Sequence, residues 1–470
     1  YQRRVRGMFL IVSFAFPKPK EWRKRRVYQI MTDRFASVEQ KPCVDLYRYC
    51  GGKYKAAIQK LDYIKNLGYN ALWISPTVRQ TEDSDKSYHG YWYGDFYESN
   101  PWFGTDQDLK DFIKECHKRD IWVMADIVYN HVGNCNQDLL NYSCVTTFPK
   151  AEHYHDYCEI TDYNNQTMVK VCRLLGLPDL DQDNQFVRKT LLDWAVWYQK
   201  TYDFDGYRVD TVKHIEHDFW QDLRKVTPWF NVAEIFDGSF DFIKSYSNSR
   251  ELYTAFNYPL FFNLRSSIGG GASMRGISKV FFEALEKFGD GVKDMGIFLE
   301  NHDNARFLTE HKGDLRRYEN ALALVHTWVG IPYLYYGSEQ DMTGGLDPDN
   351  RHALWELGYS VTKNHYPFIQ KLNRLRAKFQ VEQLDQRELY VLDNFYSYAR
   401  GNKFMVALTN SGKNGETIHV KVPNTPFEPN TQVCNIFWEN DCLNVNSDGS
   451  LDVTLTQGEA KVFVREKDTQ

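Results

Sequence analysis

Carboxylate side chains follow three separate apolar segments of this chain. Asp210, Glu234 and Asp303 each stand at or just after the end of such a segment. A pair of carboxyl groups, one ionised and one protonated, is the usual machinery for cleaving a glycosidic bond. Arg208 precedes Asp210 by two residues, so on a strand both side chains face the same side. The guanidinium would keep Asp210 ionised, as a nucleophile requires.

Each of these residues also has a structural alternative. A lone aspartate at a strand end is more often a helix cap or a loop anchor, and a lone histidine is usually a hydrogen-bonded structural residue. Asn130 and His131 follow another apolar segment, and His302 adjoins Asp303. The combined pattern is more specific than any of its members.

The elements that carry these residues alternate between short apolar runs and helical patterns. Eight such units predict an α/β protein with a (β/α)8 TIM barrel, in which active-site residues lie at the C-terminal ends of the strands. The eight strand candidates are Val27–Met31, Ala71–Ser75, Trp122–Val128, Gly206–Asp210, Phe230–Ile235, Leu252–Phe256, Gly296–Asn301 and Ile331–Tyr336. The helical patterns include Tyr54–Leu67, Asp106–Arg119, Val187–Thr201 and Leu315–Val329.

Two parts of the chain do not fit the alternating pattern. The connection after the third strand is too long for a structureless loop, so we expect a small inserted domain at residues 131–185. The barrel would then occupy residues 18–130 and 186–384. After that, short alternating strands separated by Asn, Gly and Pro predict a C-terminal antiparallel β-sandwich domain at residues 385–470.

The composition excludes several classes of protein. Charged residues make up 25% and hydrophobic residues 42%, which excludes a disordered, collagen-like or low-complexity chain. The net charge of −5 provides no global positive field for nucleic acid or an anionic membrane. No apolar run reaches 18 residues, so no transmembrane helix is predicted. We expect neither nucleic acid nor a membrane as partner, and we expect a monomer.

The cysteines favour an oxidising compartment. Eight of the nine group by short spacing, although connectivity cannot be deduced from the sequence. The absence of any Cys-x2-Cys spacing argues against metal binding, and Cys116 lies in a helical pattern as a buried free thiol. The groups are Cys43 with Cys50, Cys135 with Cys144, Cys158 with Cys172, and Cys434 with Cys442.

Other features also favour secretion. Residues 1–17 combine basic residues with an apolar stretch, which is typical of a short signal peptide, the alternative being a disordered end. Asn141 and Asn165 each begin an Asn-x-Ser/Thr sequon, which would accept a glycan in a secretory pathway. We expect a secreted protein.

Four segments, in order and in the expected strand contexts, resemble the signature regions of the α-amylase superfamily (glycoside hydrolase family 13). They are Asp126–His131, Gly206–His214, Ala233–Gly238 and Phe298–Asp303. Further matches are Met31–Phe35, Tyr88–Trp92 and Asp347–Arg351. The Cys158/Cys172 spacing and Leu177-Pro-Asp179 resemble the secreted fungal-type α-amylases. The resemblance runs from about Trp22 into the C-terminal domain.

The resemblance implies an endo-acting, retaining enzyme that hydrolyses internal α-1,4 links in starch, glycogen and maltooligosaccharides. Asp210 would be the nucleophile, Glu234 the general acid/base and Asp303 the third carboxylate, which binds substrate hydroxyls. The residues implied around the −1 sugar are Arg208, His131, His302 and Tyr91, with His89 and Trp92 in the same segment as Tyr91. Asp347 and Arg351 would form a remote glycone-side pair, and Lys213, His214, Phe236 and Gly238 would lie on the leaving-group side.

The resemblance also implies a structural Ca²⁺ between the barrel and the inserted domain. Asn130 and Asp179 would supply side-chain oxygens, and Lys170 and His214 backbone carbonyls, because calcium prefers oxygen ligands. Lys170 departs from the glutamate found there in the family, and its charge could weaken affinity if more than the carbonyl took part.

Two other functions remain open. The same signature regions serve α-glucan transglycosylases, cyclomaltodextrinases and maltooligosaccharide-degrading glucosidases, although Lys213-His214 after the nucleophile is characteristic of the α-amylases. A catalytically inactive barrel used as a carbohydrate-binding or scaffold module is the alternative from another class. It would lack the carboxylates and carry a membrane anchor, whereas all three carboxylates are present and no spanning helix is predicted.

Overall fold

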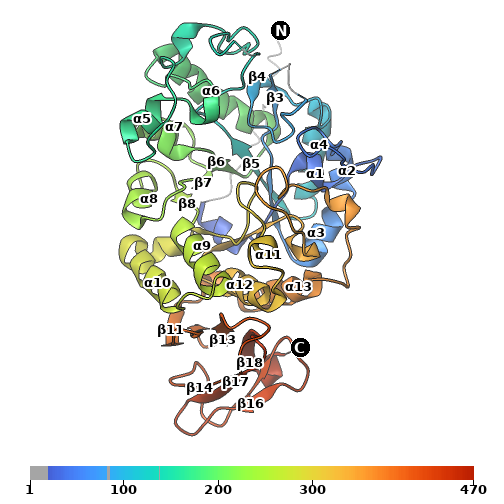
Figure 1. Ribbon diagram of the computed structural model, residues 1–470, viewed down its shortest axis with the longest axis vertical. Coiled ribbons are helices and arrows are strands. Elements are labelled where there is room, and N and C mark those ends of the chain that lie inside the picture. The colour runs from blue at the N-terminus through green and yellow to red at the C-terminus, as the bar shows by residue number, and fades with distance from the viewer. Residues whose placement is uncertain (1–18, 82–84, 137, 470) are drawn as a thin grey trace, which may run out of the picture.

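The computed structural model describes residues 19–81, 85–136 and 138–469, so the expected signal peptide at residues 1–17 lies outside the described residues. Eight parallel strands form one sheet in the order β8-β7-β6-β5-β2-β1-β10-β9 (Figure 1). A bridge between Phe256 and Gly296 brings the two edges together, so the sheet forms a nearly closed barrel. The strands are β1 (Val27–Gln29), β2 (Ala71–Ile74), β5 (Trp122–Ile127), β6 (Gly206–Val209), β7 (Phe230–Ala233), β8 (Thr254–Ala255), β9 (Gly296–Ile297) and β10 (Ile331–Tyr335). All eight predicted strands are confirmed, with narrower bounds.

Alternate residues of each strand face the inside of the barrel. The inner ones form their own hydrophobic cluster, which includes Trp73, Met124 and Phe230. Trp22, from the turn before β1, stacks on Phe230 with ring centroids 4.8 Å apart. It lies so close to β6 that a Cβ on Gly206 would come within 2.7 Å of its ring. The lower barrel is thus a packed core, and the inward polar side chains Gln29, Asp126 and Arg208 lie towards the C-terminal ends of β1, β5 and β6.

Helices surround the sheet. The predicted helices at Asp106, Val187 and Leu315 are confirmed as α4 (Asp106–His117), α6 (Gln185–Tyr202) and α12 (Leu315–Thr327). Further α-helices are α1 (Thr32–Phe35), α5 (Gln166–Val171), α7 (His217–Val226), α8 (Phe240–Tyr246), α9 (Tyr258–Leu264), α10 (Arg275–Phe288), α11 (Phe307–Glu310) and α13 (Tyr366–Phe379).

The prediction of one continuous helix over Tyr54–Leu67 is wrong, because the segment forms two helices. It is split into α2 (Tyr54–Ile58) and α3 (Leu61–Leu67). The amides of Gln59 and Lys60 bond three residues back, to Ala56 and Ala57, which tightens the chain into a turn between the two helices. The hydrophobic periodicity could not reveal this break, because both pieces bury the same face.

The segment after β5 packs against a hairpin that the sequence did not predict. This hairpin, β3 (Val78–Gln80) with β4 (Tyr93–Ser99), stands at the top of Figure 1 beside the long connection from residue 131. The amides of Gly133 and Thr146 bond to the carbonyls of Tyr93 and Gly94 on β4. Disulfides Cys135–Cys144 and Cys158–Cys172 close loops within the connection.

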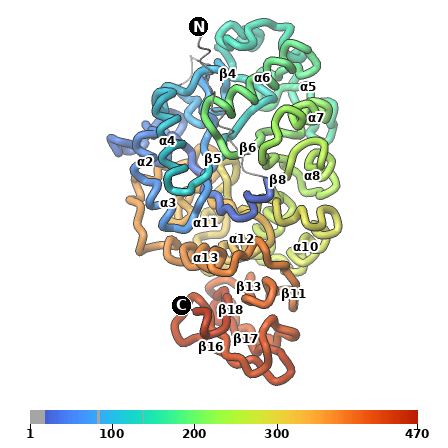
Figure 2. Tube along the Cα trace, turned by 180° about the vertical axis from the view of Figure 1, so that it is seen from behind, coloured from blue at the N-terminus to red at the C-terminus, as the bar shows by residue number. Residues whose placement is uncertain are grey.

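The C-terminal part is an antiparallel β domain of two sheets, in the orders β11-β12-β13-β18-β15-β16 and β14-β17. It lies below the barrel, next to α12 and α13 (Figures 1 and 2). The strands are β11 (Gln386–Val391), β12 (Phe395–Arg400), β13 (Phe404–Thr409), β14 (Ile418–Val422), β15 (Gln432–Asn435), β16 (Cys442–Asn444), β17 (Leu451–Leu455) and β18 (Lys461–Arg465). Arg400 is buried at the junction and donates to the backbone carbonyl of Thr327 at the end of α12.

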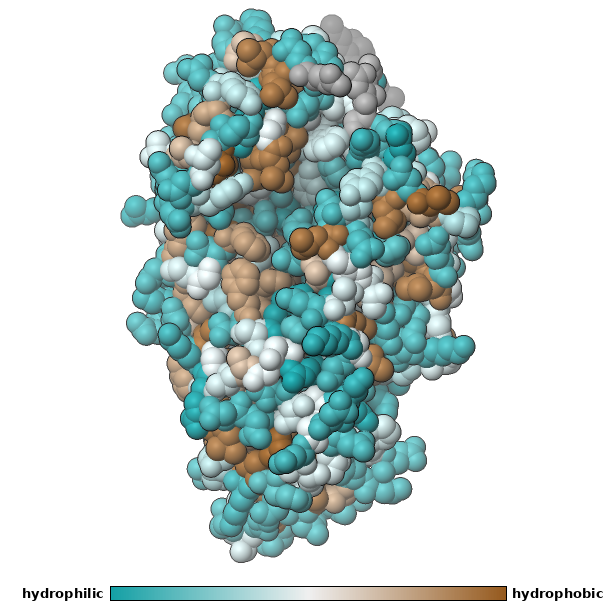
Figure 3. Space-filling view, viewed as in Figure 1, coloured by the Kyte–Doolittle hydropathy of each residue, from teal (hydrophilic) through white to brown (hydrophobic). Residues whose placement is uncertain are grey.

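All four short-range cysteine groups are disulfides, the remaining two being Cys43–Cys50 and Cys434–Cys442. Cys116 is a buried free thiol, as predicted. Hydrophobic side chains reach the face shown in Figure 3 in separate patches rather than as one continuous area. Within the described part of the chain, no helix is both long and apolar enough to cross a membrane.

Candidate active site

Arg208 joins the two carboxyl groups that the sequence places at neighbouring strand ends. Asp210 and Glu234 directly follow β6 and β7, which pair in parallel. Nη1 of Arg208 donates to Oδ1 of Asp210 at 2.5 Å, and Nη2 lies 3.3 Å from Oε2 of Glu234. The amide of Thr211 donates to the same Glu234 oxygen at 2.8 Å. The expected placement of the guanidinium beside Asp210 is therefore observed.

A fourth carboxylate, Asp126, lies on the other side of Arg208. It stands opposite Arg208 in the pairing of β5 with β6 and accepts from Nη1 at 3.0 Å. Its other oxygen accepts from Trp73 Nε1 at 2.9 Å and from the Tyr91 hydroxyl at 2.7 Å. Burial raises the pKa of Asp126 to about 7, against the opposing effect of the Arg208 charge.

Glu234 has the properties of a proton donor. Burial raises its pKa to about 8; Arg208 opposes this rise, and the negative charges of Asp210 and Asp303 add to it. A group with this pKa is mostly protonated at neutral pH.

A chain of hydrogen bonds orients His302 and Tyr91. The side-chain amide of Gln29 lies 2.9 Å from Nδ1 of His302, and Nε2 of His302 lies 2.6 Å from the Tyr91 hydroxyl. The two rings stack at 5.3 Å and 3°. Burial holds the pKa of His302 well below its usual value, and the nearby arginines add to this effect. A neutral ring with Nε2–H donating to Tyr91, which donates in turn to Asp126, satisfies every partner.

The other predicted histidines of the site are also held neutral by burial, which lowers the pKa of His131 and of His89. Nε2 of His131 is buried and has no hydrogen-bond partner among the described residues, so it is free for a ligand. His89 accepts the amide of Tyr91 at 3.0 Å and meets the half-buried ring of Trp92 edge-on, with centroids 4.9 Å apart.

Arg351 links the third carboxylate to the remote glycone-side pair. Its Nη2 lies 3.7 Å from Asp303, which is 40% exposed, and its Nη1 lies 2.8 Å from Asp347. Its Nε donates to the backbone carbonyl of His302 at 2.9 Å. Tyr88 donates to Asp347 at 3.1 Å and accepts from Arg351. Asp303, Asp347 and Arg351 therefore form one connected edge of the site.

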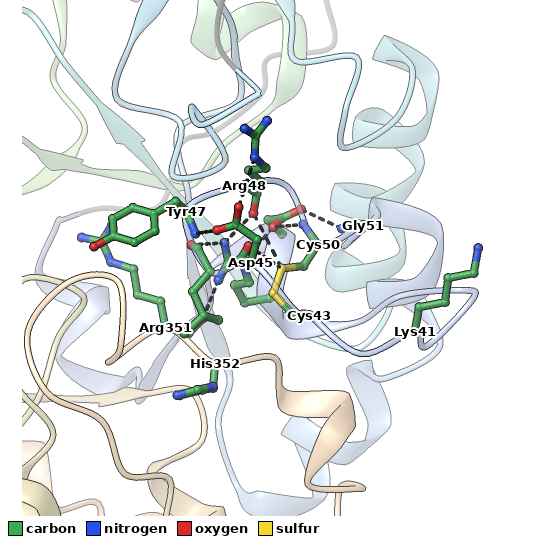
Figure 4. Close-up of a disulfide and its surroundings, with 12 residues drawn as sticks. Lys41, Cys43, Asp45, Tyr47, Arg48, Cys50, Gly51, Arg351 and His352 are labelled. Carbon is green, nitrogen blue, oxygen red and sulfur yellow. Dashed lines mark hydrogen bonds and ion pairs between the residues drawn. A yellow bond between two sulfur atoms is a disulfide. The ribbon is translucent and has the colours of Figure 1, made fainter.

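A disulfide-closed loop, Cys43–Cys50, supports this edge (Figure 4). The buried guanidinium of Arg34 donates to the carbonyls of Leu46 and Arg48 in the loop and to the carbonyl of Arg351. The position of Arg351 is thus coupled to the loop through a single side chain.

The residues expected on the leaving-group side form a separate group. Lys213 donates from Nζ to the carbonyl of Phe236 at 3.0 Å. Phe236 is 44% exposed and packs edge-on against Tyr258 and Phe262. Gly238 is exposed, and a Cβ there would meet only Phe262, at 3.9 Å. Phe236, Gly238 and the half-buried Lys213 thus form a partly exposed shelf, and Phe236 and Gly238 closely follow Glu234 in the chain.

The four expected calcium residues lie on adjoining segments. Leu180 donates to the carbonyl of Asn130, and a bridge pairs His131 with Asp179. His214 Nδ1 lies 3.0 Å from the carbonyl of Val169, the residue before Lys170.

The donor chemistry of this set fits a hard cation. Oδ1 of Asn130 and Oδ1 of Asp179 are buried without hydrogen-bond partners among the described residues. The Lys170 ammonium pairs with Glu216 at 2.8 Å, which leaves only its carbonyl for a cation. No cluster of three or more His, Cys, Asp and Glu suited to a metal occurs in the described ranges, but the expected set is mostly amide and carbonyl oxygen.

The sequence reasoning assigned no role to several residues that hold the site together. Asp126 and Gln29 stand out as polar side chains within apolar strands. Both occupy positions whose side chains face the inside of the barrel, as Arg208 does. A polar residue at an inward-facing position of an apolar strand is a signal that could have identified them from the sequence. Trp73 could not be distinguished from an ordinary core residue without the fold, and Arg34 and Tyr88 lie in segments that resemble the family but were given no role.

Comparisons with known proteins agree with this geometry. The family model described as "Alpha amylase, catalytic domain" matches residues 29–390, and "Alpha-amylase, domain C" matches residues 388–470. The curated "Alpha-amylase 1" of Schwanniomyces occidentalis is 33% identical over 94% of this chain and 90% of that protein.

Solved structures give the same result. An alpha-amylase from Malbranchea cinnamomea is 31% identical, with a TM-score of 0.90 over 96% of this chain and 98% of the other. A cyclomaltodextrin glucanotransferase with a three-domain ABC distribution is 25% identical, with a TM-score of 0.80 over 94% and 99% of the two chains. The family models together span the barrel and the C-terminal domain, and this chain belongs to the alpha-amylase family.

Proposed function

We propose that the protein hydrolyses internal α-1,4-glucosidic bonds of starch, glycogen and maltooligosaccharides with retention of configuration. The observation that supports this most directly is the pair Asp210 and Glu234, held by one guanidinium, with the pKa of Glu234 raised to about 8. Retaining glycosidases need one ionised and one protonated carboxyl group, with the two roughly 5–5.5 Å apart.

In this mechanism, Asp210 attacks the anomeric carbon while Glu234 donates its proton to the departing glycosidic oxygen. The bond from carbon to that oxygen breaks, and a covalent glycosyl ester of Asp210 forms. Glu234, now ionised, takes a proton from water, which attacks the same carbon and releases Asp210. Two inversions leave the α-configuration unchanged.

Other residues would bind and orient the sugar. The unpartnered Nε2 of His131 can hydrogen-bond to a hydroxyl of the −1 sugar, and Tyr91, held parallel to His302, offers its ring to the same sugar. Asp303 is exposed enough to accept bonds from sugar hydroxyls. The shelf at Phe236, Gly238 and Lys213 would receive the leaving part of the chain.

Calcium is part of this proposal. The orphaned oxygens of Asn130 and Asp179, with the carbonyls of Lys170 and His214, would hold Ca²⁺ between the barrel and the segment from residue 131. The ion would join His155, whose Nδ1 lies 2.7 Å from Oδ2 of Asp179, in compensating this buried carboxylate, whose pKa burial raises to about 7. It would tie the two segments together and take no part in the chemistry at the sugar.

We further propose a secreted protein that acts as a monomer. The four disulfides suit an oxidising compartment. Asn141 and Asn165 lie in exposed or half-exposed turns, and Asn165 caps α5 through its side-chain oxygen, which leaves the nitrogen free for a glycan.

The glucanotransferase relative keeps one alternative open, namely transfer of the glycosyl group to another glucan. A blocked maltoheptaoside, followed by product size and anomeric form, separates the two. We expect α-configured maltose and maltotriose early in the reaction, and a loss of at least about a hundredfold in Glu234→Gln. Products longer than the substrate would show transfer instead, and no turnover with calcium present would contradict both.

A further inference from the structure

Thr211 contacts both carboxyl groups of the proposed reaction. It follows Asp210 directly, and its hydroxyl donates to Oδ2 of Asp210 at 3.1 Å. Its backbone amide donates to Oε2 of Glu234 at 2.8 Å. Thr211 is half-buried and lies two residues after the end of β6. A residue that is neither acid nor base is thus bonded to the groups proposed as nucleophile and as proton donor.

The backbone of Thr211 has a conformation that this residue type rarely adopts. Its φ is 47° and its ψ is 40°, in the left-handed region. A β-branched residue is strained there, because its Cβ crowds the backbone, and such strain persists only where the surrounding structure holds it. The amide of Val212 donates to the carbonyl of Glu234, and the amide of His214 donates to the carbonyl of Thr211. These bonds hold the strained turn at the ends of β6 and β7.

The two oxygens of Asp210 have different donors. Arg208 donates to Oδ1, and Thr211 donates to Oδ2. The terminal torsion of an aspartate has a broad energy minimum, so a single donor leaves the plane of the carboxylate free to turn. Donors on both oxygens fix that plane. A carboxylate that attacks a carbon atom needs a defined direction of approach, and a small error in that direction is costly.

The amide of Thr211 acts on the other carboxyl group. Oε2 of Glu234 accepts this amide and also lies 3.3 Å from Nη2 of Arg208. An oxygen that faces two N–H groups is disfavoured as the carrier of the acidic proton, because that proton would compete with them. The arrangement therefore favours Oε1 as the oxygen from which Glu234 donates. This contact belongs to the backbone, so a change of the Thr211 side chain that keeps the turn leaves it in place.

We propose that Thr211 is a positioning residue of the active site, whose hydroxyl sets the plane of the Asp210 carboxylate for attack on the anomeric carbon. This role rests on the proposed function, because it presupposes that Asp210 attacks a sugar. The hydroxyl acts through Asp210 and not through Glu234. It should therefore affect every substrate that Asp210 attacks, whether or not the leaving group needs a proton.

The test compares Thr211→Val, which keeps the branched shape and removes the hydroxyl, with Thr211→Ser, which keeps the hydroxyl. With the blocked maltoheptaoside, Thr211→Val should lower kcat by about ten- to a hundredfold, since a hydrogen bond to a charged group is lost, and should leave KM within about twofold. Thr211→Ser should retain kcat within about threefold of the parent.

Thr146→Val is the matched control. The hydroxyl of Thr146 also donates to an aspartate, Asp95, but at an exposed position away from the proposed active site, so its loss should leave kcat unchanged. Circular dichroism and Tm of each variant show whether it is folded. If Thr211→Val does not fold, Thr211→Ala replaces it, with the same expected loss.

A second substrate, α-maltosyl fluoride, separates the two carboxyl groups. Fluoride leaves with the bonding electron pair and needs no proton from Glu234, while the ester of Asp210 forms as before. In Thr211→Val, kcat/KM for the fluoride should therefore fall by a factor similar to that for the maltoheptaoside. A loss that disappears with the fluoride would overturn the proposal, because the hydroxyl would then act on proton donation.

Two further results would also overturn it, namely a Thr211→Val variant as active as the parent and a Thr211→Ser variant as impaired as Thr211→Val. A parent that converts the fluoride only into longer glucans would contradict the proposed hydrolysis. A loss of fluoride release in Thr211→Val would still support the role of Thr211 in that case, because transfer also passes through the ester of Asp210. A parent that releases no fluoride would contradict both.

Discussion

Arg208 lies within 3.3 Å of Glu234 and 2.5 Å of Asp210, at the ends of two neighbouring parallel strands. It also contacts Asp126 at 3.0 Å, so one buried guanidinium serves three carboxyl groups. One positive charge cannot keep three such groups ionised in a buried site. Burial raises the pKa of Glu234 to about 8 and that of Asp126 to about 7, and the Arg208 charge opposes both rises without cancelling them.

The pH dependence of catalysis should report Glu234. Because the reaction needs its protonated form, kcat/KM should fall as the pH rises through about 8, the value to which burial raises this pKa. The measurement is kcat/KM on a blocked maltooligosaccharide from pH 4 to about 10. Asp347→Asn, which removes a remote carboxylate, should leave the fall of kcat/KM at high pH at the same pH as in the parent. A basic limb near pH 5 would mean that Glu234 has an ordinary carboxyl pKa.

Asp126 should be needed for stability as well as for activity. Asp126→Ala leaves Trp73 Nε1 and the Tyr91 hydroxyl buried without an acceptor and removes one carboxylate partner of Arg208, so the free energy of unfolding should fall by about 3–5 kcal/mol. Asp126→Asn keeps one acceptor oxygen and should cost about 1–3 kcal/mol. Both variants should lose activity, because Arg208 and Tyr91 are no longer oriented.

Urea unfolding followed by circular dichroism would give these energies. Asp45→Asn, at a 52% exposed carboxylate, is the control and should be nearly neutral. An Asp126→Ala variant as stable as the parent would show that the network can relax around the missing group.

Removing calcium should lower thermal stability. An ion at about a hundred times its dissociation constant stabilises the folded state by about 2.7 kcal/mol, so excess chelator should lower Tm by a few degrees, and added Ca²⁺ should restore it. Asp179→Ala should abolish this calcium-dependent shift. Asp181→Asn, at a neighbouring carboxylate, should retain it, and an Asp179→Ala variant that still responds to calcium would place the ion elsewhere.

The disulfide Cys43–Cys50 should affect substrate binding through Arg34. Replacing both cysteines by alanine should cost about 2–3 kcal/mol of stability for a loop of this length. It should also raise KM for longer maltooligosaccharides, because the loop carbonyls that hold Arg34 beside Arg351 become mobile. The matched control is Cys434→Ala with Cys442→Ala, which opens a loop of similar size in the C-terminal domain.

In that comparison both double variants should lose similar stability, measured by urea unfolding, and only the first should change KM. Equal KM values would show that Arg34 holds its place without the disulfide.

The sequence by itself determined the barrel, its eight strands and the candidate carboxylates. Continuous apolar runs mark strands buried on both faces, and Asp210, Glu234 and Asp303 follow such runs in motifs whose order and spacing resemble one family. The disulfide groups were also visible, because short spacing limits the choice of partners. These are local signals, carried by a few consecutive residues.

Only the tertiary structure decided which residues meet. The register between β5 and β6 places Asp126 opposite Arg208, although 82 residues separate them in the sequence. The contact of Arg34 with the Cys43–Cys50 loop and with Arg351 depends on segments that the closed barrel brings together. Raised pKa values have the same origin, because burial and neighbouring charge are properties of the packed molecule and not of a residue type.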